Sequence, residues 1–280
     1  MYSADQLNAK IKKVAQDLGV QDVNRVRGIV TLERIIARLV TNKLLKEHLV
    51  FGGGFVLYKE LETNRYTRDA DAVINGVNEQ QLTKEIKASL NRDLEDGFWF
   101  GDVITEELAT ESGYGGLRFK ILYKVGSPIP SEDEKRQLRR IHLDISIGVD
   151  LEDVARLKVT ESILPSMDAI EWKIYPPEFI ASEKIHCLLD RGDTNTRGKD
   201  VYDLPFIFDD VKDKDLLRAI ERTFKRRSLE MDSLYEGAKL VDTEYLKKSY
   251  DLILIDDKTR SFEESWKIIL KKLKALDALR

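Results

Sequence analysis

The chain of 280 residues has one cysteine, six prolines and three histidines. The single cysteine, Cys187, excludes a framework of disulfide bonds and is typical of a reducing compartment. No apolar stretch approaches the roughly 20 residues that a membrane-spanning helix needs. The first residues, MYSADQLNAKIKK, contain no apolar core like that of a signal peptide. These absences predict a soluble protein of the cytoplasm.

The composition is that of a chain that can bury a core. Hydrophobic residues make up 42% of it and charged residues 34%, and its length allows one large domain or two. The formal net charge is −4, although residues 211–280 carry a slight excess of Lys and Arg. This distribution fits an acidic first domain joined to one that faces a polyanion, but ordinary surface helices would produce it as well.

Hydrophobic periodicity predicts two helices within residues 4–46, with Gly19 ending the first and Thr31 beginning the second. A short apolar strand then enters the glycine turn at 52–54, and a helix opens directly from that turn. The next strand is DADAVI, at 69–74, and another helix follows it.

Two further strands are expected at 116–126 and 139–148, joined by a polar loop. The remainder is expected to be mostly helical, with Pro205 kinking or breaking one helix. The order predicts an α+β fold: a mixed sheet with flanking helices over residues 1–168, and a mostly helical C-terminal domain over residues 169–280.

Asp69 and Asp71 are the first candidate functional residues. Side chains at alternate positions of a strand project from the same face, with Cα atoms roughly 6.5–7 Å apart. Two carboxylates at that separation can share a divalent cation such as Mg²⁺, whereas without one they would repel each other. The simpler alternative is a solvent-facing strand end.

A third aspartate, Asp144, lies in the predicted strand IHLDISIG, on the face opposite its apolar residues. A carboxylate in so apolar a strand is costly unless it is paired, exposed or bound to a metal. If this strand lies beside that of Asp69 and Asp71, the three carboxylates could hold two metal ions for phosphoryl transfer. Alone, Asp144 would be an ordinary strand-edge carboxylate.

Two basic or flexible segments could bind phosphate. Gly52, Gly53 and Gly54 join a strand to a helix, where free backbone N–H groups can hold phosphate oxygens, although tight turns also use glycine for φ > 0. Lys184 lies at the edge of the apolar stripe of its helix, from which it could extend into solvent or reach a ligand's phosphates. Further charges around the next loop and helix are Arg191, Arg197, Lys199, Asp200 and Asp203.

Together these motifs resemble the DNA polymerase beta-like nucleotidyltransferase superfamily. They resemble more closely the AbiEii/AbiGii toxins of type IV toxin–antitoxin and abortive-infection systems. In that family a Gly-Gly turn is followed by R-aromatic-S/T-x-D-x-D, which here is RYTRDAD at 65–71. The second signature is an EK pair and then R-x-K-D-x-Y-D-L, which here are Glu183-Lys184 and RGKDVYDL at 197–204. Gly54 stands where the family usually has Ser or Thr, whose hydroxyl donates to the nucleotide's phosphates.

The resemblance implies roles for individual residues. Asp69 and Asp71 would hold Mg²⁺ in a two-metal site, with Asp144 as the candidate third carboxylate. Lys184 would contact the nucleotide, and Asp200 would complete the catalytic set from the helical domain. The residues implied in NTP binding are Gly52, Gly53, Gly54, Thr67, Lys184, Arg197 and Lys199.

The resemblance also implies a function: Mg²⁺-dependent transfer of NMP from an NTP to an RNA acceptor, by a toxin that has a cognate antitoxin. Because some members of the family modify tRNA 3′ ends, tRNA is the expected acceptor, and the basic stretches at 225–227 and 271–274 could face its backbone. Two alternatives stay open. A small-molecule, antibiotic-type nucleotidyltransferase would share every catalytic carboxylate, and a catalytically degenerate nucleotide-binding module would account for Gly54.

Overall fold

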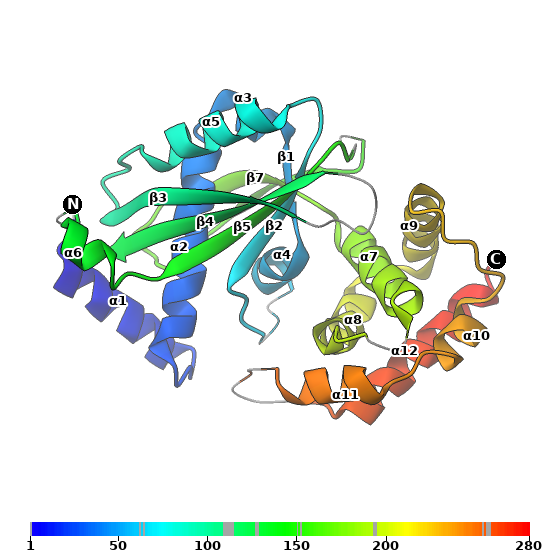
Figure 1. The fold of residues 1–280 in the computed structure, drawn as a ribbon. Helices are drawn as coiled ribbons and strands as arrows, with labels where there is room; N and C mark the ends of the chain where they lie inside the picture. The colour runs from blue at the N-terminus through cyan, green and yellow to red at the C-terminus, as the bar shows by residue number, and fades with distance from the viewer. Residues whose placement is uncertain are drawn as a thin grey trace. The chain divides into compact units, whose positions relative to one another are not determined.

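The structure, a computed structural model, describes residues 2–61, 63, 65–108, 115–126, 129–149, 151, 153–192, 195–253, 255 and 259–280. The chain forms two compact units (Figure 1). The first, here the sheet unit, comprises Met1–Lys59 and Tyr66–Tyr175, and the second, the helical unit, comprises Glu60–Arg65 and Pro176–Arg280. The short segment Glu60–Arg65 therefore belongs with the helical unit, although both of its neighbours in the chain belong to the sheet unit.

The sheet unit is built on a mixed sheet in which seven strands are described, in the order β3-β4-β5-β2-β1-β7-β6. The pairs β1–β7 and β2–β5 are parallel, and the other pairs are antiparallel. The α+β fold predicted from the sequence is confirmed. The strands are β1 (Leu49–Gly52), β2 (Asp69–Ile74), β3 (Phe98–Glu107), β4 (Gly116–Val125), β5 (Arg140–Ile147), β6 (Arg156–Thr160) and β7 (Ile170–Ile174).

Four of these strands, β1, β2, β4 and β5, lie where the sequence predicts them, whereas β3, β6 and β7 were not predicted. Strand β3 ends in polar residues and contains a register shift between Gly101 and Ile104, which obscures a period of two. Strand β6, at one edge of the sheet, alternates polar and apolar residues over Arg156–Thr160, a signal that was not recognised, and it is almost entirely exposed. Strand β7 has only five residues.

The helices of this part of the chain correct two predictions. Thr31 does not begin a helix: it lies inside α2, and its hydroxyl donates to the Arg27 carbonyl over 2.7 Å. The N-cap is Asp22, whose side chain accepts from the backbone N–H of Asn24. The predicted second helix is also divided, because Asn42 caps a new one. The helices are α1 (Ala4–Asp17), α2 (Val23–Leu39), α3 (Lys43–His48), α4 (Gly53–Glu60), α5 (Glu79–Leu90) and α6 (Glu132–Lys135).

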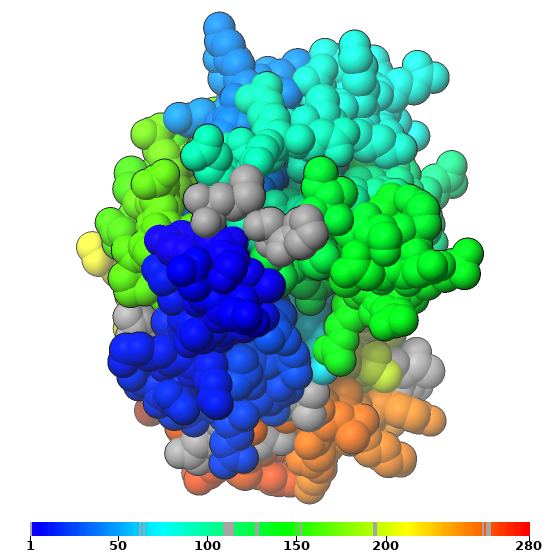
Figure 2. Space-filling model, turned by 90° about the vertical axis from the view of Figure 1, so that its left-hand side faces the viewer, coloured from blue at the N-terminus to red at the C-terminus, as the bar shows by residue number. Residues whose placement is uncertain are grey.

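The two faces of the central strands have different surroundings. Alternate residues of β2 and β5 are buried, and they are Ala70, Ala72, Ile74, Ile141, Leu143 and Ile145. Helix α2, which is buried along most of its length, contacts α1, α5 and β7, while α1 remains partly at the surface, in dark blue in Figure 2. The other face of β2 and β5 carries half-buried polar residues, and it includes the predicted site.

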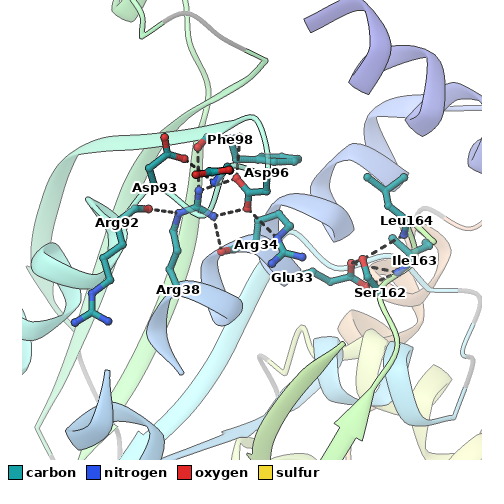
Figure 3. Close-up of polar contacts among 11 residues, drawn as sticks. Glu33, Arg34, Arg38, Arg92, Asp93, Asp96, Phe98, Ser162, Ile163 and Leu164 are labelled. Carbon is teal, nitrogen blue, oxygen red and sulfur yellow. Dashed lines mark hydrogen bonds and ion pairs between the residues drawn. The ribbon is translucent and has the colours of Figure 1, made fainter. Parts of the chain in front are cut away.

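A buried arginine network attaches α2 to the segment before β3 (Figure 3). Arg38 is 1% exposed, and all five N–H groups of its guanidinium have an acceptor. They donate to both carboxylate oxygens of Asp96 over 2.7 and 2.8 Å and to the carbonyls of Arg34, Arg92 and Phe98 over 3.0 Å each. A buried charge needs such complete pairing. This network fixes the start of β3 against α2.

The helical unit contains α7 (Pro177–Asp190), α8 (Gly198–Asp210), α9 (Asp213–Arg226), α10 (Leu234–Lys239), α11 (Glu244–Asp251) and α12 (Phe262–Asp277). Helix α7 packs on α9, and α8 packs on α11 and α12. Pro205 lies inside α8, which continues past it, so the predicted break does not occur. Helix α11 ends at Asp251; the helix predicted to continue from there reaches residues 254 and 256–257, which lie outside the described residues. Within the described chain, no helix combines the length and apolar character needed to cross a membrane.

The Arg38 network generates a stability prediction. Arg38→Lys removes the paired donors and should lower the free energy of unfolding by about 3 kcal/mol, because several hydrogen bonds to buried groups are lost. Arg34→Lys is the matched control: Arg34 donates to Asp96 through Nε, while its buried Nη1 has no hydrogen-bond partner in the described part of the chain. Urea unfolding followed by circular dichroism measures both. Equal losses for the two variants would contradict a special role of Arg38.

Candidate active site

The glycine turn at the end of β1 is shaped by the carboxylate of Asp71. Gly53 begins α4 with φ of +67°, and a Cβ atom there would lie 1.9 Å from Asp71 Oδ2. Both the left-handed backbone and the lack of space exclude other residues. Gly52, by contrast, could carry a Cβ at 3.6 Å from Tyr175, an ordinary contact, and Gly54 is buried in the first turn of α4. The turn and the DxD strand therefore form one constellation.

The register of the sheet brings the predicted carboxylates together. Asp69 and Asp71 lie on the same, half-buried face of β2, and the parallel pairing of β2 with β5 places Asp71 opposite Asp144. Gly52 is opposite Asp71 on the other side. The condition set for a three-carboxylate site, that the strand of Asp144 lies beside the DxD strand, is therefore met.

Arg118, which the sequence analysis did not single out, holds the third carboxylate. It lies on β4 opposite Asp144, and its Nε and Nη2 donate to the two oxygens of Asp144 over 2.8 and 2.6 Å. The hydrogen bond that Arg118 donates to Asp144 raises the pKa of Arg118 above its ordinary value, and the charge of Asp69 contributes to the same effect. Such bidentate pairs are strong and geometrically specific. In this structure, therefore, Asp144 is paired with the positively charged side chain of Arg118.

The predicted metal site is tested by the donors that are present. Asp69 and Asp71 provide two carboxylates on one face of one strand, which fits a hard divalent cation. Nowhere in the described chain do three His, Cys, Asp or Glu side chains form a group that could hold a metal ion. Thr67, predicted to bind nucleotide, is buried and donates its hydroxyl to Asp69 Oδ1 over 2.5 Å. This hydrogen bond orients the carboxylate of Asp69.

The second signature forms a buried charge cluster within the helical unit. Lys184 Nζ donates to Asp200 Oδ1 over 2.6 Å and to Asp203 Oδ2 over 2.8 Å. Arg65 forms a bidentate pair with Asp203 at 2.7 and 2.8 Å, and Arg197 pairs with Asp200. Both aspartates are fully buried. Three cations and two carboxylates thus lie together, with Arg197 partly exposed at the margin of the cluster, and the cluster fixes the segment that precedes β2 to α7 and α8.

Electrostatics in this cluster favour the charged forms of its members. Burial alone would lower the pKa of Lys184, but Asp200 and Asp203 raise it above its ordinary value. Burial would likewise raise the pKa values of the aspartates, but Lys184 with Arg197 or Arg65 holds them below the ordinary value. The aspartates therefore stabilise the fold above about pH 4, and this contribution is lost as the pH falls further.

The other basic residues predicted to bind a polyanion differ in their surroundings. Lys199 is exposed. Arg226 and Arg227 both pair with Glu183, and Lys272 pairs with Asp213 at 2.5 Å. Glu183 and Asp213 therefore compensate only part of the positive charge in the stretches 225–227 and 271–274.

A cavity of about 350 Å³ lies elsewhere in the sheet unit and is lined by none of the predicted site residues. Arg34, Asp96 and residues 166–170 line it. It coincides with the edge of the arginine network shown in Figure 3, not with the carboxylates of β2 and β5.

The buried cluster generates a prediction for Lys184. Lys184→Met should lower the free energy of unfolding by about 3 kcal/mol, because two buried carboxylates lose a charged donor. Lys199→Met removes the same charge from an exposed position of the same signature and should change it by less than about 0.5 kcal/mol. Urea unfolding of both variants measures the difference. If Lys184→Met is as stable as the wild type, the cluster does not stabilise the fold.

The family model described as "Nucleotidyl transferase AbiEii toxin, Type IV TA system" matches residues 34–279. The solved structure of JHP933 from Helicobacter pylori is 16% identical, with a TM-score of 0.55 over 89% of this chain and 90% of that one. MenT4, the nucleotidyltransferase toxin Rv2826c from Mycobacterium tuberculosis H37Rv, is 13% identical, with a TM-score of 0.51 over 96% and 98%. No curated protein matches the chain.

These likenesses to solved structures show a shared fold. The family model spans most of the chain, including the glycine turn, the DxD strand and the RGKDVYDL signature. The chain therefore belongs to the AbiEii nucleotidyl transferase toxin family of type IV toxin–antitoxin systems, and it is a nucleotidyltransferase.

Proposed function

We propose that this nucleotidyltransferase transfers NMP from an NTP to an RNA acceptor, with tRNA as the first candidate, in a reaction that depends on Mg²⁺. The observation that carries the proposal is the approach of Asp71 Oδ2 to Gly53 at a position that no Cβ could share. A glycine turn, a DxD pair and a facing Asp144 are thereby collected at one place on the sheet. Membership in a toxin–antitoxin family supports a cognate antitoxin as partner and the cytoplasm as the place of action.

Asp69 and Asp71 are the residues that would hold the cation. The chemistry that Mg²⁺ supplies when bound is polarisation of the phosphates and a lower pKa for the attacking hydroxyl. Thr67 orients the Asp69 carboxylate through its hydroxyl. The backbone N–H groups at Gly53 and Gly54 provide donors for phosphate oxygens at the start of α4, without the hydroxyl that relatives place at position 54.

The helical unit contributes in a different way. Lys184 and Asp200 are predicted from the family resemblance to complete the catalytic set, and both are engaged in the buried cluster. In this proposal the cluster holds α7 and α8 in a fixed arrangement, and the exposed Lys199 remains a candidate for contact with a phosphate of the NTP or the RNA.

The function is tested by a transfer assay. The wild-type protein is incubated with each α-labelled NTP, Mg²⁺ and either total cellular RNA or a panel of aminoglycosides. We expect label in RNA of tRNA size, and Asp69→Asn should reduce it by about a thousandfold, because transition-state stabilisation by one such group is worth that much. Label only in the small molecules would overturn the RNA acceptor, and undiminished transfer by Asp69→Asn would overturn the assignment of the site.

A second prediction concerns the glycine turn. Gly53→Ala forces either the Asp71 carboxylate or the turn to move, since the new Cβ would lie 1.9 Å from Oδ2. We expect transfer to fall by more than about tenfold, with weaker Mn²⁺ binding in calorimetry, while a left-handed alanine costs about 1–2 kcal/mol of stability. Gly52→Ala, whose Cβ would make only an ordinary contact, should lose less. Equal effects at both positions would show that the close approach to Asp71 is unimportant.

A further inference from the structure

A row of charged side chains crosses four strands of the sheet beside the DxD pair. Asp71 on β2 is opposite Asp144 on β5, Asp144 is opposite Arg118 on β4, and Arg118 is opposite Glu106 on β3. Residues opposite each other in a sheet project from the same face, with Cβ atoms roughly 4.5–5.5 Å apart. Arg118 therefore lies between two carboxylates at the edge of the candidate metal site.

Arg118 is directed to Asp144 specifically. Its Nε and Nη2 groups donate to the two oxygens of Asp144, at 2.8 and 2.6 Å. Glu106, its other neighbour, instead accepts from Lys120 Nζ over 2.6 Å. The Asp144 side chain is 14% exposed, so this pair is only partly screened by solvent. The fork geometry of arginine, which matches a carboxylate, explains the choice.

This pairing competes with metal binding. A carboxylate that ligates a cation must direct lone pairs to it, and here both oxygens of Asp144 accept from Arg118. A divalent cation would also be repelled by a guanidinium beside it. This agrees with the finding that no group of three potential ligands is assembled for a metal in the chain as described.

We propose that Arg118 is a positioning residue that competes with a divalent cation for Asp144. Asp69 and Asp71 bind the cation first, and Asp144 joins them only when Arg118 is displaced. Arg118 thereby sets the cation concentration at which the three-carboxylate site forms. The inference rests on the proposed function in one respect, that Asp69 and Asp71 are the metal ligands.

The experiment measures Mn²⁺ binding to the full chain without nucleotide, by electron paramagnetic resonance of the free ion. Arg118→Gln should bind Mn²⁺ roughly tenfold more tightly than the wild type or better, which corresponds to about 1.4 kcal/mol. Arg118→Lys should fall between them, because an ammonium retains the charge but not the bidentate geometry. Circular dichroism confirms that each variant is folded.

Two controls distinguish an effect of the Arg118–Asp144 pair on Mn²⁺ affinity from a general effect of removing one positive charge. Lys120→Gln removes one positive charge two residues along the same strand, from a side chain paired with Glu106, and should bind Mn²⁺ like the wild type. In an Asp144→Asn background, Arg118→Gln should lose its effect, because no carboxylate is left to release.

The outcomes distinguish the two proposals. If the wild type binds Mn²⁺, Asp69→Asn abolishes binding and Arg118→Gln leaves the affinity unchanged, the role of Arg118 is overturned and the proposed function stands. The role is also overturned if Lys120→Gln tightens binding as much as Arg118→Gln does. If no variant and no wild-type protein binds Mn²⁺, both proposals fail.

Discussion

The approach of the Asp71 carboxylate to the backbone of Gly53 is the constraint on which the candidate site depends. An oxygen that occupies the place of a Cβ requires a left-handed glycine at the first position of α4, and that glycine turns the chain from β1 into the helix. The antiparallel register of β1 and β2 and the parallel register of β2 and β5 then determine which residues lie beside Asp71. The close approach at Gly53 and the two registers together place the glycine turn, Asp71 and Asp144 at one point on the sheet.

Charge compensation follows the same logic in both units but with different consequences. In the helical unit, Asp200 and Asp203 are fully buried. Both accept from Lys184, and each also pairs with one arginine. Removal of any member therefore leaves a charge in a medium that solvates it poorly. On the sheet, the Asp144 and Arg118 side chains are 14% and 36% exposed, so the pair can open at lower cost. A cluster of the first kind suits a rigid support, and a pair of the second kind suits exchange with a ligand.

The sequence predicted those parts of the fold and site that rest on local patterns. Alternation in DADAVI and IHLDISIG placed Asp69 and Asp71 on one face of their strand and Asp144 on the polar face of its own, and the family signatures identified the enzyme class. Arg118 was not predicted as a site residue, because its pairing with Asp144 depends on strand register between residues that are 26 positions apart in the sequence. Thr31 was predicted to begin a helix because threonine often caps one. Inside a helix, however, its hydroxyl can instead donate to the carbonyl four residues back, as it does here to Arg27. Strand β6 alternates polar and apolar residues over only Arg156–Thr160, a short signal that was not recognised.

The different environments of the signature residues affect how variants are interpreted. Asp69 and Asp71 are half-buried on the polar face of β2, beside the glycine turn, so we expect their substitution to affect transfer more than stability. Lys184 belongs to a buried network in which its ammonium group donates to Asp200 and Asp203, two carboxylates of the following helix. Loss of transfer in a Lys184 variant therefore has two physical explanations, a missing contact with nucleotide and a weakened helical unit. Only measurements of stability and of KM against kcat on the same variant separate them.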